Sequence, residues 1–251
     1  LLDTPLIEEL PKGRMSTTTG KRNYSWRADK PSTLIYVKAL DKGNPAIKTE
    51  YRDEVFEIDA PFSGEGKSLV KTTNRFSGID WGTESIAIVY DYWWDTRNRK
   101  AYVFNPSSPN SKPKTLYDRN YQDIYSDPGS FLKTRNTFNK SVLMLHKGSA
   151  FLRGAGFSEK GQFPFIDKVN ITTLNKSRVY QSKYTDKVEA IQDYNPATNE
   201  LIVRIESPTE YPNYYSKKTN GKRLTKITDF ENPFEELQNV KKEVITYKRD
   251  A

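Results

Sequence analysis

The 251-residue sequence contains no cysteine and only one histidine, His146. Without cysteine the chain can form no disulfide, thiolate nucleophile or cysteine-ligated metal site. One histidine cannot supply the two or three imidazoles of a usual catalytic zinc site, so we expect His146, at the end of an apolar stretch, to be structural. No G-x-S-x-G sequence occurs, and the serine nucleophile of an α/β-hydrolase is therefore absent from these residues. We expect no catalytic residue, metal or cofactor in this chain.

Long apolar runs are also missing. No stretch approaches the roughly 18–20 consecutive apolar residues that span a bilayer, and the first ten residues, LLDTPLIEEL, have no basic segment ahead of their apolar residues. They are therefore not a signal peptide as written. The compartment stays open, with an exported or periplasmic location expected for a bacterial parent.

The net charge of +8 raises the question of nucleic-acid binding. The lysines and arginines are nevertheless spread over the whole chain, mostly as single residues or pairs such as Lys217-Lys218. In that pattern they are expected to be solvated in turns and at strand ends, where they also blunt exposed sheet edges. The distribution therefore predicts no nucleic-acid partner.

What the sequence does contain is a repeated pattern of β-structure. An aromatic residue, a short polar turn and a run of β-branched and aromatic residues recur four times, led by Trp26, Trp81, Phe138 and Tyr194. The successive separations are 55, 57 and 56 residues. A fixed period of this size, built from strands and turns, indicates a β-propeller, and four units are too few to close a ring. We therefore predict an all-β fold, a partial propeller of about four four-stranded antiparallel blades.

The repeats are predicted to cover residues 20–74, 75–122, 123–186 and 187–231, so that residues 1–231 form the propeller portion. In the first two repeats, the predicted strands are Arg22–Trp26, Thr33–Leu40, Glu54–Asp59 and Lys67–Thr72, then Gly78–Trp81, Ser85–Trp94, Ala101–Asn105 and Lys114–Tyr117. In the last two they are Phe131–Thr134, Ser141–Leu145, Phe165–Asn170 and Arg178–Ser182, then Val188–Asp193, Glu200–Ile205, Asn213–Lys217 and Leu224–Thr228. The second strand of each repeat is a nearly continuous apolar run, as expected for a strand covered on both faces.

The remaining residues, 232–251, read as a connector. Asn232–Val240 has a helix-start signal, with Asn232 followed by Pro233, and predicts a short helix. Glu243–Lys248, sequence EVITYK, is a further strand candidate. Between the second and third repeats, Asp123–Ser130 combines aspartate, serine, proline and glycine and predicts a rigid turn-forming connector.

Two groups of residues qualify as candidate binding sites. Asp91 and Asp95 flank the pair Trp93–Trp94, an arrangement typical of sugar sites, although packing between blades explains the same aromatic residues. Arg97 and Arg99, in the turn that follows, could clamp a carboxylate or could belong to a solvated hairpin turn. Both interpretations of each group stay open at this point.

Long segments of the chain resemble the glutamyl endopeptidase branch of the prolyl oligopeptidase serine peptidases. They are RNYSWRADKPSTLIYVKALDKGNPAIKTEYRDEVF (Arg22–Phe56), RFSGIDWGTESIAIVYDYWWDTRNR (Arg75–Arg99), DIYSDPGS (Asp123–Ser130), GFSEKGQFPFIDKVNITT (Gly156–Thr173) and ITDFENPFEELQNVKKEVITYKRDA (Ile227–Ala251). The resemblance covers essentially the whole chain in order, connectors included.

The resemblance implies an N-terminal propeller that precedes an α/β-hydrolase domain with a Ser-Asp-His triad. No triad residue of that family has a matching position here, so the chain would be a non-catalytic portion that gates peptide access to an active site elsewhere. The segment resembling Glu243–Ala251 would lead into the hydrolase domain. If the parent cleaves after glutamate, Arg97 and Arg99 are the candidates to meet the substrate carboxylate.

Two alternatives remain: a stand-alone binding propeller, for carbohydrate in one version, and a nucleic-acid binder. The parent gene distinguishes these alternatives from the peptidase interpretation. The peptidase interpretation requires that the reading frame continue past Ala251 into a hydrolase with G-x-S-x-G. The expected partners are peptide substrates through the parent enzyme, the missing blades and the hydrolase domain. An open arc of four blades also exposes two apolar faces, which predicts self-association of the isolated chain, in one form as a two-fold pair.

Overall fold

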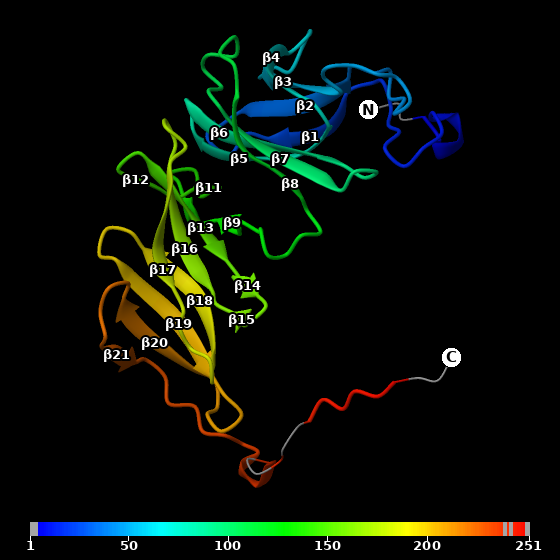
Figure 1. Ribbon diagram of the computed structural model, residues 1–251. Coiled ribbons are helices and arrows are strands. Elements are labelled where there is room, and N and C mark those ends of the chain that lie inside the picture. Colours follow the sequence, from blue (N-terminus) through cyan, green and yellow to red (C-terminus); the bar gives the residue numbers. More distant parts are fainter. Residues whose placement is uncertain (1–4, 238–239, 241–242, 249–251) are drawn as a thin grey trace. The chain divides into compact units, whose positions relative to one another are not determined.

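The computed structural model describes residues 5–237, 240 and 243–248, and the regular secondary structure of these residues is almost entirely antiparallel β-sheet (Figure 1). The helical segments of the described residues are two 3-10 turns, η1 (Ile7–Glu9) and η2 (Glu235–Leu237). No helix among these residues has the length and apolar character needed to cross a membrane. The chain divides into two compact units: one extends through Gly154 and includes Ile166–Arg178, and the other contains Ala155–Phe165 and continues from Val179.

The first two sheets are regular four-stranded meanders. Sheet one has the order β1 (Arg22–Trp26), β2 (Thr33–Ala39), β3 (Asp53–Asp59), β4 (Lys67–Thr72), and sheet two the order β5 (Arg75–Thr83), β6 (Ile86–Trp93), β7 (Asn98–Phe104), β8 (Lys114–Asn120). Each strand pairs in antiparallel fashion with the next one in the chain, through connections that range from tight turns to the longer loops 40–52 and 105–113. The predicted blades of the first two repeats are thereby confirmed.

The third sheet has the order β12 (Leu145–His146), β13 (Ser149–Gly154), β16 (Phe165–Asn170), β17 (Lys176–Gln181), with β9 (Ser130–Phe131) also paired to β13. β9 and β12 together form one interrupted first strand. Phe131 lies opposite Leu152 and Leu145 opposite Ala150, while the Leu132 amide donates to the Phe151 carbonyl at 2.8 Å. A hairpin, β10 (Lys133–Arg135) and β11 (Ser141–Leu143), is inserted at the interruption.

The prediction for the third repeat was therefore wrong in its first half. Phe131–Thr134 and Ser141–Leu145 are not the first two strands of the blade, and the true second strand, Ser149–Gly154, was missed. Phe138 lies in the turn of the inserted hairpin, between β10 and β11, whereas Trp26, Trp81 and Tyr194 lie near the ends of the first strands of their sheets. The turn that corresponds to those after Trp81 and Tyr194 follows His146, so the aromatic period at Phe138 arises from the insertion.

The second compact unit contains the fourth sheet, with the order β18 (Val188–Asn195), β19 (Glu200–Glu206), β20 (Asn213–Lys218), β21 (Leu224–Lys226), close to the predicted strands. It also contains a small hairpin, β14 (Phe157–Ser158) and β15 (Gly161–Gln162). The predicted helix over Asn232–Val240 is reduced to the turn η2 in its described part. Glu243–Lys248 forms no strand, and its Val244 is 95% exposed, because no described strand offers it hydrogen-bond partners.

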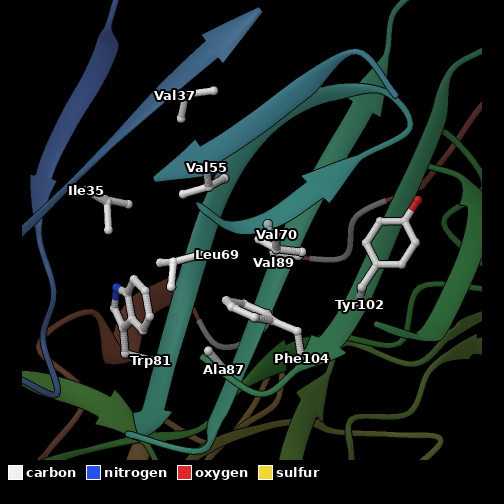
Figure 2. Close-up of a cluster of buried hydrophobic side chains, with 10 residues drawn as sticks. All are labelled: Ile35, Val37, Val55, Leu69, Val70, Trp81, Ala87, Val89, Tyr102 and Phe104. Carbon is white, nitrogen blue, oxygen red and sulfur yellow. The ribbon is translucent and has the colours of Figure 1, made fainter. Parts of the chain in front are cut away.

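The core of the first unit lies on the two faces of the second sheet. On one face, apolar side chains of the first and second sheets interdigitate: Ile35, Val37, Val55, Leu69, Val70, Trp81, Ala87, Val89, Tyr102 and Phe104 (Figure 2). On the other face, the buried cluster joins the second and third sheets: Ile88, Ala101, Val103, Phe131, Leu143, Ala150, Leu152, Val169 and Ile171. Alternate residues of β6 thus point to different neighbours, as expected for a sheet stacked between two others.

Candidate functional site

A pocket of about 400 Å³ opens where the second sheet meets the start of the third. Its wall is formed by β5, β6, β7 and β8 of the second sheet together with the connector Asp127–Gly129, β9 and Lys133. The lining is rich in tyrosine and charge: Asp80, Tyr90, Arg99, Tyr117, Arg119, Tyr121, Asp127 and Lys133. Its volume lies within the range of ordinary ligand pockets.

Arg99 and Arg119 form the cationic part of this wall. They lie directly opposite each other on the neighbouring strands β7 and β8, so both side chains are on the sheet face that carries Tyr90 and Tyr117. The Arg99 guanidinium lies 5.5 Å from the centre of the Tyr90 ring. Arg119 donates from Nε to the Ser126 hydroxyl at 3.3 Å and also bonds the Asp123 carbonyl.

An ion pair also lines the pocket. Lys133 Nζ lies 2.6 Å from Asp80 Oδ1, and the Tyr90 hydroxyl donates to Asp80 Oδ2 at 2.8 Å. Burial, and then the Asp80 charge, raise the pKa of Tyr90, so this phenol stays protonated and donates. Lys133 and Asp80 therefore neutralise each other and hold the base of the inserted hairpin against β5.

The connector between the repeats has the turn geometry expected from its sequence. Asp123 Oδ1 accepts from the Tyr125 amide at 3.0 Å, and Asp127 Oδ1 accepts from the Gly129 amide at 2.8 Å. Gly129 has a φ of +82°, and a Cβ there would lie 2.2 Å from the Arg153 carbonyl oxygen. Only glycine fits, and the rim of the pocket next to Arg119 is fixed by this turn.

The two candidate arginines are separated by the structure. Arg99 lines the pocket, whereas Arg97 sits in the tight turn after β6 with a φ of +54° and lies outside the pocket lining. The Arg97 guanidinium lies 4.1 Å from the centre of the Trp94 ring and donates to the Trp94 carbonyl at 2.6 Å. Arg97 is thus engaged with its own turn, while Arg99 faces a space that a ligand can enter.

The possible sugar platform takes a different form from the one its sequence suggests. Asp91 is fully buried and accepts hydrogen bonds from the Asn74 amide at 2.9 Å and the Tyr102 hydroxyl at 3.2 Å. Arginines stack on the two indoles: Arg52 lies 3.9 Å from the Trp93 ring centre, and Arg14 lies 4.9 Å from that of Trp94. Asp91, Trp93 and Trp94 therefore take part in packing within the first unit, whereas Asp95 is exposed in the turn.

His146 and the acidic residues are potential metal ligands in the described part of the chain. His146 is half-buried in β12 opposite Ser149 and lines neither of the two described pockets. Among the residues that the structure describes, no group of three or more histidine and acidic side chains could hold a metal ion.

The second unit has a smaller pocket of about 270 Å³, lined partly by Tyr184 and Glu189. Glu189 is 2% exposed, accepts from the Tyr180 hydroxyl at 2.6 Å and lies 3.2 Å from Lys217 Nζ. Burial, followed by the hydrogen bond to Glu189, raises the pKa of Tyr180. This buried acid is fully partnered, so it stabilises the fold and offers no free group to a ligand.

Sequence reasoning found Arg99 but missed the rest of the pocket. Arg119 fell outside the predicted strand Lys114–Tyr117, because β8 continues to Asn120. Lys133 was assigned to a strand of the third blade, whereas it begins the inserted hairpin. The available signal was the alternation of Tyr117 and Arg119, which places both on one face of an extended strand.

Comparison with known proteins gives a consistent relationship. No protein-family model matches the chain. The chain is 34% identical over 266 aligned residues to the probable chloroplastic glutamyl endopeptidase of Oryza sativa subsp. japonica and 33% identical to that of Arabidopsis thaliana, in each case covering 99% of the chain. It spans 28% of the length of each of these relatives. Among solved structures, oligopeptidase B from Trypanosoma brucei is 12% identical with a TM-score of 0.40, covering 82% of this chain and 27% of that one, a likeness too distant to support an argument.

Fold and comparison together identify the class of protein. The chain is an all-β protein of four-stranded antiparallel sheets that resemble propeller blades. It is a homologue of one segment of the glutamyl endopeptidases, and the resemblance predicted from its sequence is confirmed over nearly its whole length.

Proposed function

We propose that the chain is the non-catalytic propeller portion of a serine peptidase and that it gates the access of peptides to an active site outside these residues. The homology to glutamyl endopeptidases supports the peptidase parent. The 251 residues contain no G-x-S-x-G, so catalysis by acyl transfer would belong to another part of the parent. The chain itself then contributes steric selection of substrates.

The inserted hairpin β10–β11 is the observation that carries the gating proposal. It leaves the first strand of the third sheet, the edge that faces the central channel when such sheets are arranged as propeller blades. Its Asn136 Nδ2 donates to the Ala28 carbonyl, just after β1, at 2.7 Å. Its base is held to Asp80 of β5 by Lys133. The hairpin thus ties the inner edges of three sheets together, where an obstacle would narrow the channel.

The test is made in the intact parent enzyme. Asn136→Ala combined with Lys133→Ala removes these two polar attachments of the hairpin and is expected to raise the rate of cleavage of long, folded polypeptides relative to a short chromogenic peptide. Lys140→Ala, on the same hairpin with an exposed side chain, is the matched control and should leave the ratio of the two rates unchanged. An unaltered ratio in the double variant, with the short-peptide rate intact, would refute gating by this hairpin.

A stand-alone binding propeller is the second candidate, and the open pocket at Arg99 is the observation that favours it. The two candidates differ in the parent gene. A reading frame that continues into a hydrolase with G-x-S-x-G supports the peptidase, and one that stops supports the binding module.

A further inference from the structure

The arginines of the pocket differ from the buried arginines of the first unit in exposure and in partners. Arg99 is exposed and Arg119 is half-buried, whereas Arg27 and Arg75 are buried. Arg75 pairs with Asp41 at 2.8 Å and with Asp53 at 3.0 Å, and Arg27 pairs with Asp29 at 2.6 Å and also with Glu57. Arg99, by contrast, has no carboxylate within ion-pair distance among the described residues. Its guanidinium instead lies over the face of the Tyr90 ring.

Arg99 also lies directly opposite a second cation. Like charges opposite each other on neighbouring strands destabilise a sheet, and Arg99 and Arg119 are such a pair. The nearby acids do not relieve Arg99. Asp80 is bound to Lys133 and Tyr90, Asp127 caps the Gly129 turn, and Asp123 interacts with Arg119. The pocket therefore keeps one cation in excess, since Arg99, Arg119 and Lys133 face Asp80 and Asp127.

We propose that this pocket binds the carboxylate of a peptide, with the Arg99 guanidinium as its anchor and the Tyr90 and Tyr117 rings beside the apolar part of the ligand. A planar carboxylate matches a guanidinium with two parallel hydrogen bonds. A phosphate fits less well, because its second negative charge would be repelled by Asp80 and Asp127 in the same wall. The choice of a peptide as carrier rests on the proposed function, whereas the affinity for a carboxylate does not.

Direct binding to the full 251-residue chain tests the proposal without any catalytic measurement. The probes are short alanine peptides capped at both ends, one with a central glutamate and one with a central glutamine, and a third with a free C-terminal carboxylate as its only charge. Isothermal titration should show the glutamine peptide binding at least about tenfold more weakly than the better of the two carboxylate peptides. Which carboxylate peptide binds better distinguishes an acidic side chain from a chain terminus as the source.

Three variants locate the site. Arg99→Ala should lower the affinity for the better carboxylate peptide about tenfold, whereas Arg97→Ala, two residues away in the same hairpin and outside the pocket, should leave it unchanged. Arg99→Lys keeps the positive charge but cannot form two parallel hydrogen bonds with a carboxylate. Its affinity for the peptide should therefore lie between those of Arg99→Ala and Arg97→Ala. Circular dichroism confirms that each variant is folded.

Several results would overturn the proposal. The first is equal affinity for the glutamate, glutamine and terminal-carboxylate peptides. The second is an equal loss of peptide affinity in Arg99→Ala and Arg97→Ala. The third is tighter binding of inorganic phosphate than of either carboxylate peptide. Each of these outcomes leaves the gating proposal untouched, because gating is judged from the ratio of cleavage rates in the hairpin variants of the parent enzyme.

Discussion

The second sheet presents two faces that are alike in their apolar residues and different in their charges. Against the first sheet, Arg75 and Asp91 both have partners: Arg75 pairs with Asp41 and Asp53, and Asp91 accepts hydrogen bonds from the Asn74 amide and the Tyr102 hydroxyl. Against the third sheet, the apolar cluster ends in a pocket where Arg99 faces Arg119. One face is completed within the chain, and the other keeps a cation without an acid.

This difference in charge indicates that one face contributes to stability and the other to ligand binding. A buried ion that is paired and hydrogen-bonded fixes the geometry of the packing, and removing one partner exposes the full desolvation penalty of the other. A cation that the fold leaves without an acid adds nothing to stability until a ligand brings the anion. Substitutions on the two faces should therefore separate stability from binding.

The largest effect is expected on the completed face. Arg75→Met removes the cation shared by the fully buried carboxylates of Asp41 and Asp53, which keep Arg52 and Arg22 as their remaining partners. The free energy of unfolding should fall by about 3 kcal/mol, near the lower end expected for breaking a buried ion pair. Urea unfolding followed by circular dichroism measures the change. The exposed turn supplies the control, because Arg97→Met should cost less than about 1 kcal/mol.

A further variant separates charge from packing at Arg75. If the charge of Arg75 causes the loss, Arg75→Lys, which keeps the positive charge, should lose less stability than Arg75→Met. Equal losses in the two variants would show that the shape and the hydrogen bonds of the guanidinium matter more than its charge.

The second effect tests whether the apolar parts of the two faces are equal. Leu69 belongs to the cluster with the first sheet and Leu152 to the cluster with the third, and they are 2% and 1% exposed. Leu69→Ala and Leu152→Ala should each lower the free energy of unfolding by about 3 kcal/mol, from lost burial and the cavity left behind. A cost below about 1 kcal/mol for either leucine would contradict the equality on which the comparison rests.

These clusters mark how much of the fold the sequence could predict. The apolar runs around Val37 and Val89 and the turns that follow Trp26 and Trp81 are local signals, so the first two sheets were predictable strand by strand. The third sheet was not, because its first strand is split and Leu132 and Leu145 become neighbours along one strand only after the chain folds. An insertion that itself contains an aromatic residue, a polar turn and an apolar run imitates the repeat that it interrupts.

The site was less predictable than the fold, for a related reason. Arg99 could be selected because the composition of its turn is local information. Its distinction from Arg97 depends on where the turn ends and β7 begins, because Arg97 has a turn conformation with a φ of +54° and Arg99 lies within β7. The pocket also needs Lys133 from the inserted hairpin and the fixed turn at Gly129, which approach Arg99 only in three dimensions.

A third and smaller effect depends on pH and concerns Asp91. Burial raises the pKa of Asp91 above its ordinary value of 3.8, although Asn74 and Tyr102 donate hydrogen bonds to it. Between the ordinary and the raised pKa, the folded chain holds a proton that the unfolded chain has lost. The free energy of unfolding therefore falls as pH rises through this window, and the contribution is largest below pH 3.8.

Asp91→Asn removes this titration while keeping most of the shape. We compare the free energy of unfolding of the unsubstituted chain with that of the variant. The difference, unsubstituted minus variant, should be greatest at acid pH and decline as pH rises from about 4, by an amount on the order of 1 kcal/mol. Urea unfolding at a series of pH values measures it, and all other titrating groups cancel in the difference. Parallel curves for the two proteins would show that Asp91 has the same pKa folded and unfolded.

The smallest change in the free energy of unfolding is expected at Arg99. Whether this change is a gain or a loss shows whether the arginine already has a partner in the fold. Arg99→Ala removes a cation that lies opposite Arg119. The free energy of unfolding should therefore stay within about 0.5 kcal/mol of the value for the unsubstituted chain and should be slightly higher. Added salt screens the repulsion between the two guanidinium groups, so the advantage of the variant should shrink as ionic strength rises. Urea unfolding at low and high salt tests both points. A clear loss of stability in Arg99→Ala would mean that the fold already supplies a partner for this arginine, and the two faces of the second sheet would then be alike in charge as well as in packing.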